Sequence, residues 1–252
     1  MVLSIESRGL EASRGYSVRL ENVYKIYRMG DGSEFRALNG VNLTIGRGEY
    51  VAIMGPSGHG KTTLLNMIGL LDRPTKGKVY IDGVDTSSLS DVELSSFRNR
   101  KIGFVFQQYN LINRMSVLEN IELPLIVRGL PRRIRVERVV DALEKVGGER
   151  SWLHKRPTQL SGGQQQRVAI ARAIVGDPDI ILADEPTGNL DTASSRVVMD
   201  VFRRLNELGK TIILVTHASD IANCARRILL IRDGRIYGEV KPDFKRSIFN
   251  IA

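Results

Sequence analysis

Cysteine, aromatic side chains and long apolar runs are all scarce in this sequence of 252 residues. The one cysteine, Cys224, cannot form a disulfide within the chain, which excludes a disulfide scaffold and fits a reducing compartment. No apolar run approaches the roughly 20 residues that a membrane-spanning helix needs. Residues 1–16 carry acids and arginines and have no apolar stretch like that of a signal peptide, so we expect the protein to stay in the compartment where it is made.

Acidic residues are fewer than basic ones: 28 Asp and Glu stand against 37 Lys and Arg, which gives a formal charge of +9. Such an excess favours an anionic partner, either a nucleotide, a nucleic acid or an acidic membrane face. The basic clusters at residues 98–101, 132–135 and 226–227 are not interleaved with aromatic residues, as a groove for single-stranded nucleic acid requires. We therefore expect no direct binding of nucleic acid.

Apolar strand-like runs alternate with helical segments along most of the chain, which predicts an α/β fold with a parallel sheet covered on both faces. The expected strands cover residues 18–27, 41–45, 50–54, 78–81, 102–106, 180–183 and 211–216, and then a hairpin formed by 228–232 and 235–240. The expected helices cover residues 61–70, 161–175 and 193–208, with a further helix opened by the capping-box spacing of Ser90 and Glu93.

Residues 109–158 differ from the rest because they contain no convincing strand. Ser116 and Glu119 have the spacing of a second capping box, and Pro131 opens a charged amphipathic stretch that runs to Val146. This segment is predicted to be a mainly helical insert in the α/β fold.

The sequence G-P-S-G-H-G-K-T at residues 55–62 fits the phosphate-binding pattern G-x-x-x-x-G-K-[ST]. An expected strand precedes it and an expected helix follows, which is the context that the pattern requires. Glycines let backbone amides turn toward the phosphates, and the helix N-terminus adds partial positive charge. Lys61 is expected to reach the β- and γ-phosphates, and Thr62 to bind magnesium. The predicted nucleotide contacts are Gly55, Pro56, Ser57, Gly58, His59, Gly60, Lys61, Thr62 and Thr63.

Two acids, Asp184 and Glu185, end the apolar strand 180–183. The carboxyl edge of a parallel sheet is where ligands bind, and the phosphate loop follows another strand at that edge. Asp184 is therefore the predicted magnesium-side acid. Glu185 is predicted to orient or deprotonate an attacking water.

The segment Leu160-Ser-Gly-Gly-Gln164 offers a second anion site. Ser161 and Gln164 form a capping box, while the two glycines have no obvious helix-stabilising purpose and leave the backbone amides accessible. Ser161, Gly162, Gly163 and Gln164 are therefore predicted to contact a second phosphate group.

The segment Leu160-Ser-Gly-Gly-Gln164 matches the signature of a known family. Together with the phosphate loop, it makes the sequence resemble the nucleotide-binding subunit of an ABC transporter over about residues 18–238. The resemblance implies a P-loop NTPase with a RecA-like core, an antiparallel β subdomain and a helical insert. Residues 104–111, 119–125 and 186–191 resemble the lipoprotein-release, macrolide-efflux and cell-division ATPases. His59 departs from the family, which usually has serine there. Its imidazole would make nucleotide affinity weakly pH-dependent, unless it points to solvent.

The same resemblance assigns roles to residues outside the phosphate loop. Tyr27 is expected to stack on adenine, with Tyr24 as the alternative. Gln107 is expected to touch magnesium, together with Thr62 and Asp184. Residues 189–191 correspond to the D-loop, and the expected catalytic groups are Glu185, Lys61 and the switch histidine His217.

The implied domain covers residues 18–240, with an α/β core at 18–106 and 161–240, a helical subdomain at 107–160, an N-terminal extension at 1–17 and a tail at 241–252. We expect a magnesium-dependent ATPase that binds ATP between the two copies of a head-to-tail homodimer. It would power export or extraction through a membrane permease that docks near residues 106–124, which places it in the cytoplasm on the inner face of the cell membrane.

One alternative is an ABC ATPase that drives a mechanical or regulatory membrane complex and transports nothing. A DNA-repair ATPase would carry a long coiled coil in place of the short insert, and a translation factor would carry two cassettes. The transported substrate is not specified by this chain.

Overall fold

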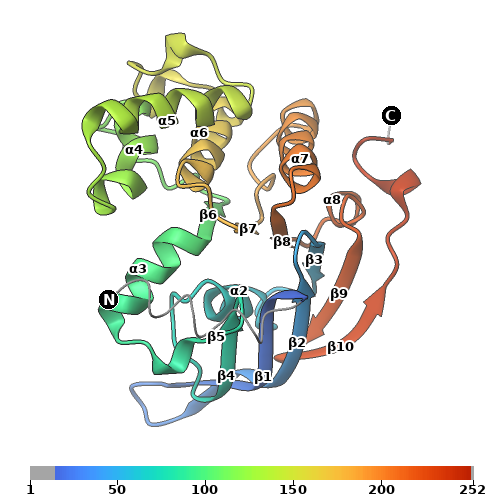
Figure 1. The fold of residues 1–252 in the computed structure, drawn as a ribbon. Coiled ribbons are helices and arrows are strands. Elements are labelled where there is room, and N and C mark those ends of the chain that lie inside the picture. Colours follow the sequence, from blue (N-terminus) through green and yellow to red (C-terminus); the bar gives the residue numbers. More distant parts are fainter. Residues whose placement is uncertain (1–14, 251–252) are drawn as a thin grey trace.

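Two β-sheets form the centre of the computed structural model, which describes residues 15–250 (Figure 1). The larger sheet has the strand order β10-β9-β3-β8-β7-β6, and all of these strands run parallel except β10, which pairs antiparallel with β9. Its strands are β3 (Tyr50–Met54), β6 (Ile102–Phe106), β7 (Ile180–Asp184), β8 (Thr211–Val215), β9 (Arg227–Arg232) and β10 (Arg235–Val240). The parallel sheet and the terminal hairpin confirm the sequence prediction.

The smaller sheet is antiparallel, with the order β2-β1-β4-β5, and it is the antiparallel subdomain that the resemblance implied. Its strands are β1 (Tyr16–Arg28), β2 (Glu34–Gly46), β4 (Lys76–Ile81) and β5 (Val84–Asp85). The expected start of β2 at residue 41 was wrong, because the strand begins at Glu34 and pairs with β1 over its whole length. Irregular register shifts along β1 hide this pairing from a simple alternation of apolar and polar residues.

The described part of the chain contains seven α-helices, and all except the short α8, which was not predicted, begin close to the residues that the local signals predicted. Capping boxes are formed at Ser90, Ser116 and Ser161. The helices are α2 (Lys61–Ile68), α3 (Asp91–Lys101), α4 (Val117–Val127), α5 (Arg132–Lys145), α6 (Gly162–Ile174), α7 (Thr192–Glu207) and α8 (Ser219–Ala222).

Two apolar cores lie on opposite faces of the parallel sheet. Along β3, Val51 and Ile53 face the core shared with the antiparallel sheet, whereas Tyr50 and Ala52 face the core shared with α6 and α7. This alternation follows from the two-residue period of a strand. The parallel strands therefore bury both of their faces, and their carboxyl ends can carry a site.

Residues 107–160 contain α4 and α5 and no strand, in agreement with the helical insert. Figure 1 shows α4, α5 and α6 grouped at the end of the molecule opposite the antiparallel sheet. Because α6 also packs against β6, it joins the helical group to the parallel sheet. The division into core and insert at residues 106 and 160 stays a prediction.

At the chain ends, the expected extension 1–17 lies mostly outside the described residues, and the tail carries a short 3-10 turn (Phe244–Arg246). Within residues 15–250, no helix combines the length and apolar character that crossing a membrane requires.

Candidate active site

The phosphate loop connects β3 to α2 and is packed tightly between two neighbouring elements. A Cβ atom at Gly55 would lie 2.2 Å from the carbonyl oxygen of Ile231, and one at Gly60 would lie 2.5 Å from the carbonyl oxygen of Ala37. Gly60 also has a φ of 98°, in the region that favours glycine. The Lys61 amine donates hydrogen bonds to the carbonyl oxygens of Gly55 and Pro56, at 2.8 and 2.9 Å. The glycines therefore permit both close packing and the curved path of the loop.

An open cavity of ≈ 670 Å³ lies over this loop. It brings together the loop, the carboxyl end of β7 and the segments that follow β6 and β8. Its lining residues are Phe35, Ala37, Ser57, Gly58, Gly60, Lys61, Thr62, Thr63, Gln107, Asp184, Glu185 and His217. Most of the predicted site residues are thus assembled around one space, whereas Tyr27, Gly55, Pro56, His59 and residues 161–164 do not line it.

Thr62 and Asp184 meet at the floor of the cavity, where the Thr62 hydroxyl donates to a carboxylate oxygen of Asp184 at 3.2 Å. Burial raises the pKa of Asp184, and the neighbouring charge of Glu185 adds to this shift, while the bond from Thr62 opposes it. In residues 15–250 no group of three or more His, Cys, Asp and Glu side chains could hold a metal. A hydroxyl and a single carboxylate are oxygen ligands of the kind that Mg²⁺ accepts beside substrate phosphates, so these residues fit magnesium.

Glu185 is held at the edge of the cavity by two hydrogen bonds. One carboxylate oxygen lies 2.7 Å from Nδ1 of His217, and the other accepts a bond from the Thr216 hydroxyl at 3.1 Å. The backbone of Glu185 has a φ of 47°, a left-handed conformation that is uncommon for glutamate and that clusters at functional sites. Sequence reasoning missed the role of Thr216, although a hydroxyl residue at the end of a central strand was a signal for it.

Gln107 and Asn189 form a reciprocal amide contact beside the carboxylates. The Gln107 amide nitrogen lies 3.4 Å from the Asn189 side-chain oxygen, and the Asn189 side chain donates to the Gln107 carbonyl at 3.1 Å. A Cβ atom at Gly188 would lie 2.7 Å from the Gln107 side-chain nitrogen. The predicted magnesium-side glutamine is therefore in contact with the predicted D-loop.

The start of α6 carries the second predicted phosphate site, and its glycines have a packing reason. A Cβ atom at Gly162 would lie 2.9 Å from the Tyr109 hydroxyl, and one at Gly163 would lie 2.8 Å from the Ser194 hydroxyl. The glycines therefore have a packing purpose besides the accessible amides that the sequence indicated, because each has a close neighbour that leaves little room for a larger side chain. The Ser161 hydroxyl accepts a hydrogen bond from the Gln164 amide, and the Ser161 amide donates to the Gln164 side chain, as in a capping box.

Three aromatic residues, Tyr24, Tyr27 and Phe35, lie near the place where an adenine contact is expected. The Tyr24 hydroxyl packs against Gly40 of β2, while the Tyr27 phenol oxygen contacts Asp72 and Thr63, a residue that lines the cavity. This arrangement favours Tyr27 over Tyr24, and its stacking on adenine stays a prediction. Phe35, the strand partner of Tyr27, lines the cavity directly with 51% of its surface exposed, and sequence reasoning missed it.

His59 does not point to solvent, as the simpler expectation held. Its ring nitrogen Nδ1 accepts a hydrogen bond from the backbone amide of Asp233 at 3.1 Å and lies 2.9 Å from the Asp233 carboxylate. The His59 carbonyl accepts a bond from the Gly234 amide. The side chain therefore fastens the phosphate loop to the β9–β10 turn.

A phosphate loop between a parallel strand and a helix, with an Asp–Glu pair at the end of β7, two strands away in the same sheet, defines a P-loop ATPase. The chain belongs to the ABC transporter family, whose sequence model matches residues 38–188. The family that the sequence resembles is thus confirmed.

The chain is similar to other ATP-binding proteins of the ABC transporter family along most of its length. It is 54% identical to an uncharacterized ABC transporter ATP-binding protein of Thermotoga maritima, over 88% of this chain and 94% of that protein. It is 48% identical to a lipoprotein-releasing system ATP-binding protein, LolD 1, of Rhodopseudomonas palustris, over 88% and 98%. Its structure matches the dimeric cassette MJ0796 of Methanocaldococcus jannaschii with a TM-score of 0.83 and 48% identity, over 90% and 99%. A further structure of MJ0796, with the same scores, is a dimer in a post-hydrolysis state with ADP and Pi.

Proposed function

We propose that this ABC ATPase hydrolyses ATP as an ATP-dependent homodimer and powers export or extraction of a substrate through a separate membrane permease. The observation that carries this proposal is the position of Glu185. Its carboxylate is held by His217 and Thr216 at the edge of a cavity that also contains Lys61 of the phosphate loop. A carboxylate fixed in this way can act as a general base toward a water that attacks the γ-phosphate.

Lys61 and His217 complete the chemistry around the γ-phosphate. The Lys61 amine is presented to the phosphates at the start of α2, where the helix adds partial positive charge. His217 keeps the Glu185 carboxylate in place and supplies a donor for charge that develops during hydrolysis. Thr62, Asp184 and Gln107 would hold Mg²⁺, which supplies neutralisation of the phosphate charge when it is bound.

The second copy is proposed to contribute Ser161, Gly162, Gly163 and Gln164. Residues 161–164 do not line the cavity of their own chain, and Ser161 is exposed. A helix N-terminus with a serine hydroxyl attracts an anion, so the triphosphate bound to one copy would bridge to the other. The dimeric assembly of MJ0796, at 48% identity, supports this arrangement.

The permease is proposed to dock in a groove of ≈ 480 Å³ that includes part of the expected region 106–124. Phe104 and Phe106 stack there at 5.7 Å, and Val127 is 75% exposed. The groove is also lined by Arg98, Arg128 and Arg172, whose hydrogen-bond acceptors within residues 15–250 are carbonyl, amide and hydroxyl oxygens and no carboxylate. Burial lowers the pKa of Arg128 and Arg172. A permease segment with acidic and apolar side chains would fit this surface, and its docking would bring the chain to the inner face of the membrane.

A charge reversal in the groove tests the permease proposal. The chain is co-expressed with a candidate permease, and the amount of permease that co-purifies from solubilised membranes is measured. Arg128→Glu is expected to reduce co-purification by roughly tenfold or more, because it adds a like charge to the acidic segment. Arg133→Glu is the matched control, since Arg133 lies on α5 with 90% of its side chain exposed. Equal co-purification of both variants would contradict the assignment of the groove.

A further inference from the structure

Lys25 and Tyr27 lie on β1, two residues apart, and their side chains are in contact. The Lys25 ammonium nitrogen lies 5.0 Å from the centre of the Tyr27 ring, within the range of a cation–π interaction. The Lys25 side chain is only 13% exposed, although it carries a charge. A buried lysine of this kind requires fixed partners, and it holds one face of the aromatic ring in place.

Asp72, in the segment that follows α2, connects these two side chains. One carboxylate oxygen accepts a hydrogen bond from Lys25 at 2.7 Å, and the other accepts one from the Tyr27 hydroxyl at 3.2 Å. Burial opposes ionisation of Asp72, but hydrogen bonds from Lys25 and from the Arg73 amide outweigh it and lower the pKa of the carboxyl. Burial, followed by the charge of Asp72, raises the pKa of Tyr27, so the phenol stays a neutral donor.

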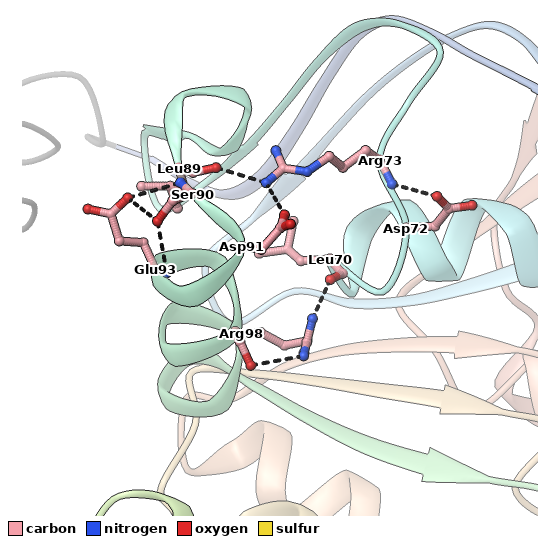
Figure 2. A network of polar contacts seen from close by, with 9 residues as sticks. Leu70, Asp72, Arg73, Leu89, Ser90, Asp91, Glu93 and Arg98 are labelled. Carbon is pink, nitrogen blue, oxygen red and sulfur yellow. Dashed lines mark hydrogen bonds and ion pairs between the residues drawn. The ribbon is translucent and has the colours of Figure 1, made fainter.

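The position of Asp72 is fixed by α3 as well as by its own segment. Figure 2 shows that the Arg73 side chain reaches the Leu89 carbonyl and the Asp91 carboxylate, at 2.8 and 2.9 Å. On the other side of Asp72, the Leu70 carbonyl accepts a hydrogen bond from Arg98 at 2.7 Å (Figure 2). Both ends of the segment are therefore tied to α3, and the carboxylate between them is presented to β1 in a defined place.

The Tyr27 hydroxyl thus donates to Asp72 and lies near Thr63, a residue of the phosphate-binding helix that lines the cavity. A ring held by a cation at its face and by a hydrogen bond at its hydroxyl has lost its freedom to rotate before any ligand arrives. Such pre-organisation lowers the entropy cost of stacking a base on the ring.

We propose that Lys25 and Asp72 are positioning residues that orient the Tyr27 ring for stacking on the adenine of ATP. This inference rests on the proposed function, because it takes the adenine contact of Tyr27 as given. Lys25 and Asp72 act through Tyr27 and do not touch the reacting phosphates.

The test separates the contribution of the base from that of the phosphates. Dissociation constants are measured by calorimetry for ATP and for inorganic triphosphate, which has no base, and their ratio is compared among variants of the full chain. Tyr27→Ala is expected to reduce the preference for ATP by roughly tenfold, the usual size of one stacking contact. Asp72→Ala and Lys25→Met are expected to reduce it by roughly threefold, with triphosphate affinity unchanged. In the Tyr27→Ala background, Asp72→Ala is expected to have no further effect.

Lys78→Met is the matched control, because Lys78 lies on the adjacent strand β4 and pairs with Asp85 in a similar ion pair. Its ratio is expected to stay at the wild-type value. If Tyr27→Ala lowers the ratio while Asp72→Ala and Lys25→Met do not, the positioning role is overturned and the adenine contact survives. If ATP and triphosphate affinities fall together, the two residues support only the fold and the proposal is also overturned. If Tyr27→Ala changes nothing, the adenine contact itself fails, although ATP hydrolysis by Glu185 remains open to its own test.

Discussion

The two groups of residues that are predicted to contact nucleotide are built differently in a single chain. Around the phosphate loop, groups from distant parts of the sequence bond directly to one another: Thr62 to Asp184, and Glu185 to His217. At the start of α6, the Ser161 hydroxyl accepts a hydrogen bond from the Gln164 amide, three residues away. The region around the phosphate loop is therefore a network of hydrogen bonds between segments that follow different strands. The start of α6 is a helix N-terminus with a local capping box.

The difference shows which part of the machinery one copy can assemble alone. The fold of one chain brings the proposed catalytic carboxylate, Glu185, to the same cavity as the phosphate loop. The start of α6 is instead positioned by the close packing of Gly162 on Tyr109 and of Gly163 on Ser194. Under the proposed function, each copy therefore contains all of the proposed catalytic groups and depends on its partner for the second phosphate contact.

The largest expected effect follows from removing the charge of the catalytic carboxylate. Glu185→Gln keeps the size of the side chain but removes the proposed base, so steady-state phosphate release is expected to fall by about 100-fold or more. ATP-dependent dimerisation, measured by size-exclusion chromatography with light scattering, is expected to persist because residues 161–164 are unchanged.

Glu207→Gln serves as the control, since Glu207 is a surface residue of α7 that pairs with Arg203. Phosphate release by this variant is expected to stay at the wild-type rate. A Glu185→Gln protein that hydrolyses ATP as fast as the wild type would show that another group is the base.

The second prediction concerns the start of α6, whose position depends on close packing against its neighbours. In Gly163→Ala, the new methyl group would lie 2.8 Å from the Ser194 hydroxyl oxygen and 2.9 Å from its Cβ atom, so the start of α6 must shift. Over-packing of this kind costs about 1–3 kcal/mol, and we expect turnover and ATP-dependent dimerisation to weaken by roughly tenfold. Affinity for ATP at low protein concentration is expected to stay unchanged.

The double variant Gly163→Ala/Ser194→Gly tests whether the packing is the cause. Ser194→Gly removes the atoms that the methyl group meets, at a helix cost of about 1 kcal/mol. Dimerisation is therefore expected to recover in the double variant, while Ser194→Gly alone dimerises normally. Failure to recover would mean that Gly163 acts through its accessible amide and not through its packing.

The same contrast explains how much of the molecule could be predicted from its sequence. Helix starts at Ser90, Ser116 and Ser161 were predicted correctly because a capping box is a contact over three residues. The phosphate loop and the Asp184–Glu185 pair were found because their patterns are short and continuous.

The residues that were missed act over long separations in the sequence. Asp72 reaches Tyr27 across 45 positions, and Thr216 reaches Glu185 across 31. Phe35 lies in the cavity because β2 starts seven residues earlier than its apolar pattern indicated, at Glu34 instead of residue 41. Such contacts depend on strand order and register, which a single sequence does not state.

A smaller effect is expected from loosening one support of the catalytic carboxylate. Thr216→Val keeps the shape of the side chain but removes the hydroxyl that donates to Glu185. One such hydrogen bond contributes about 0.5–1.5 kcal/mol, so kcat is expected to fall about threefold to tenfold while KM for ATP stays constant.

Thr211→Val is the matched control at the other end of β8, where the buried Thr211 hydroxyl contacts Ser17 and the Gly48 amide. Both variants are expected to lower the free energy of unfolding by about 1 kcal/mol, as measured by urea denaturation. Only Thr216→Val should lower kcat. An equal loss of kcat in both variants would assign the effect to stability.

The smallest effect is expected at His59. This residue is part of the phosphate loop, but its side chain contacts the β9–β10 turn. His59→Ser removes the hydrogen bond that Nδ1 accepts from the Asp233 amide, so the free energy of unfolding is expected to fall by about 1 kcal/mol. Affinity for ATP, measured by calorimetry above and below neutral pH, is expected to change by less than about twofold, because the loop binds phosphate through its backbone. A His59→Ser variant that lost a pH dependence of ATP affinity present in the wild type would instead place the imidazole in the phosphate site. In that case His59 would act on the bound phosphates, and not only stabilise the phosphate loop against the β9–β10 turn.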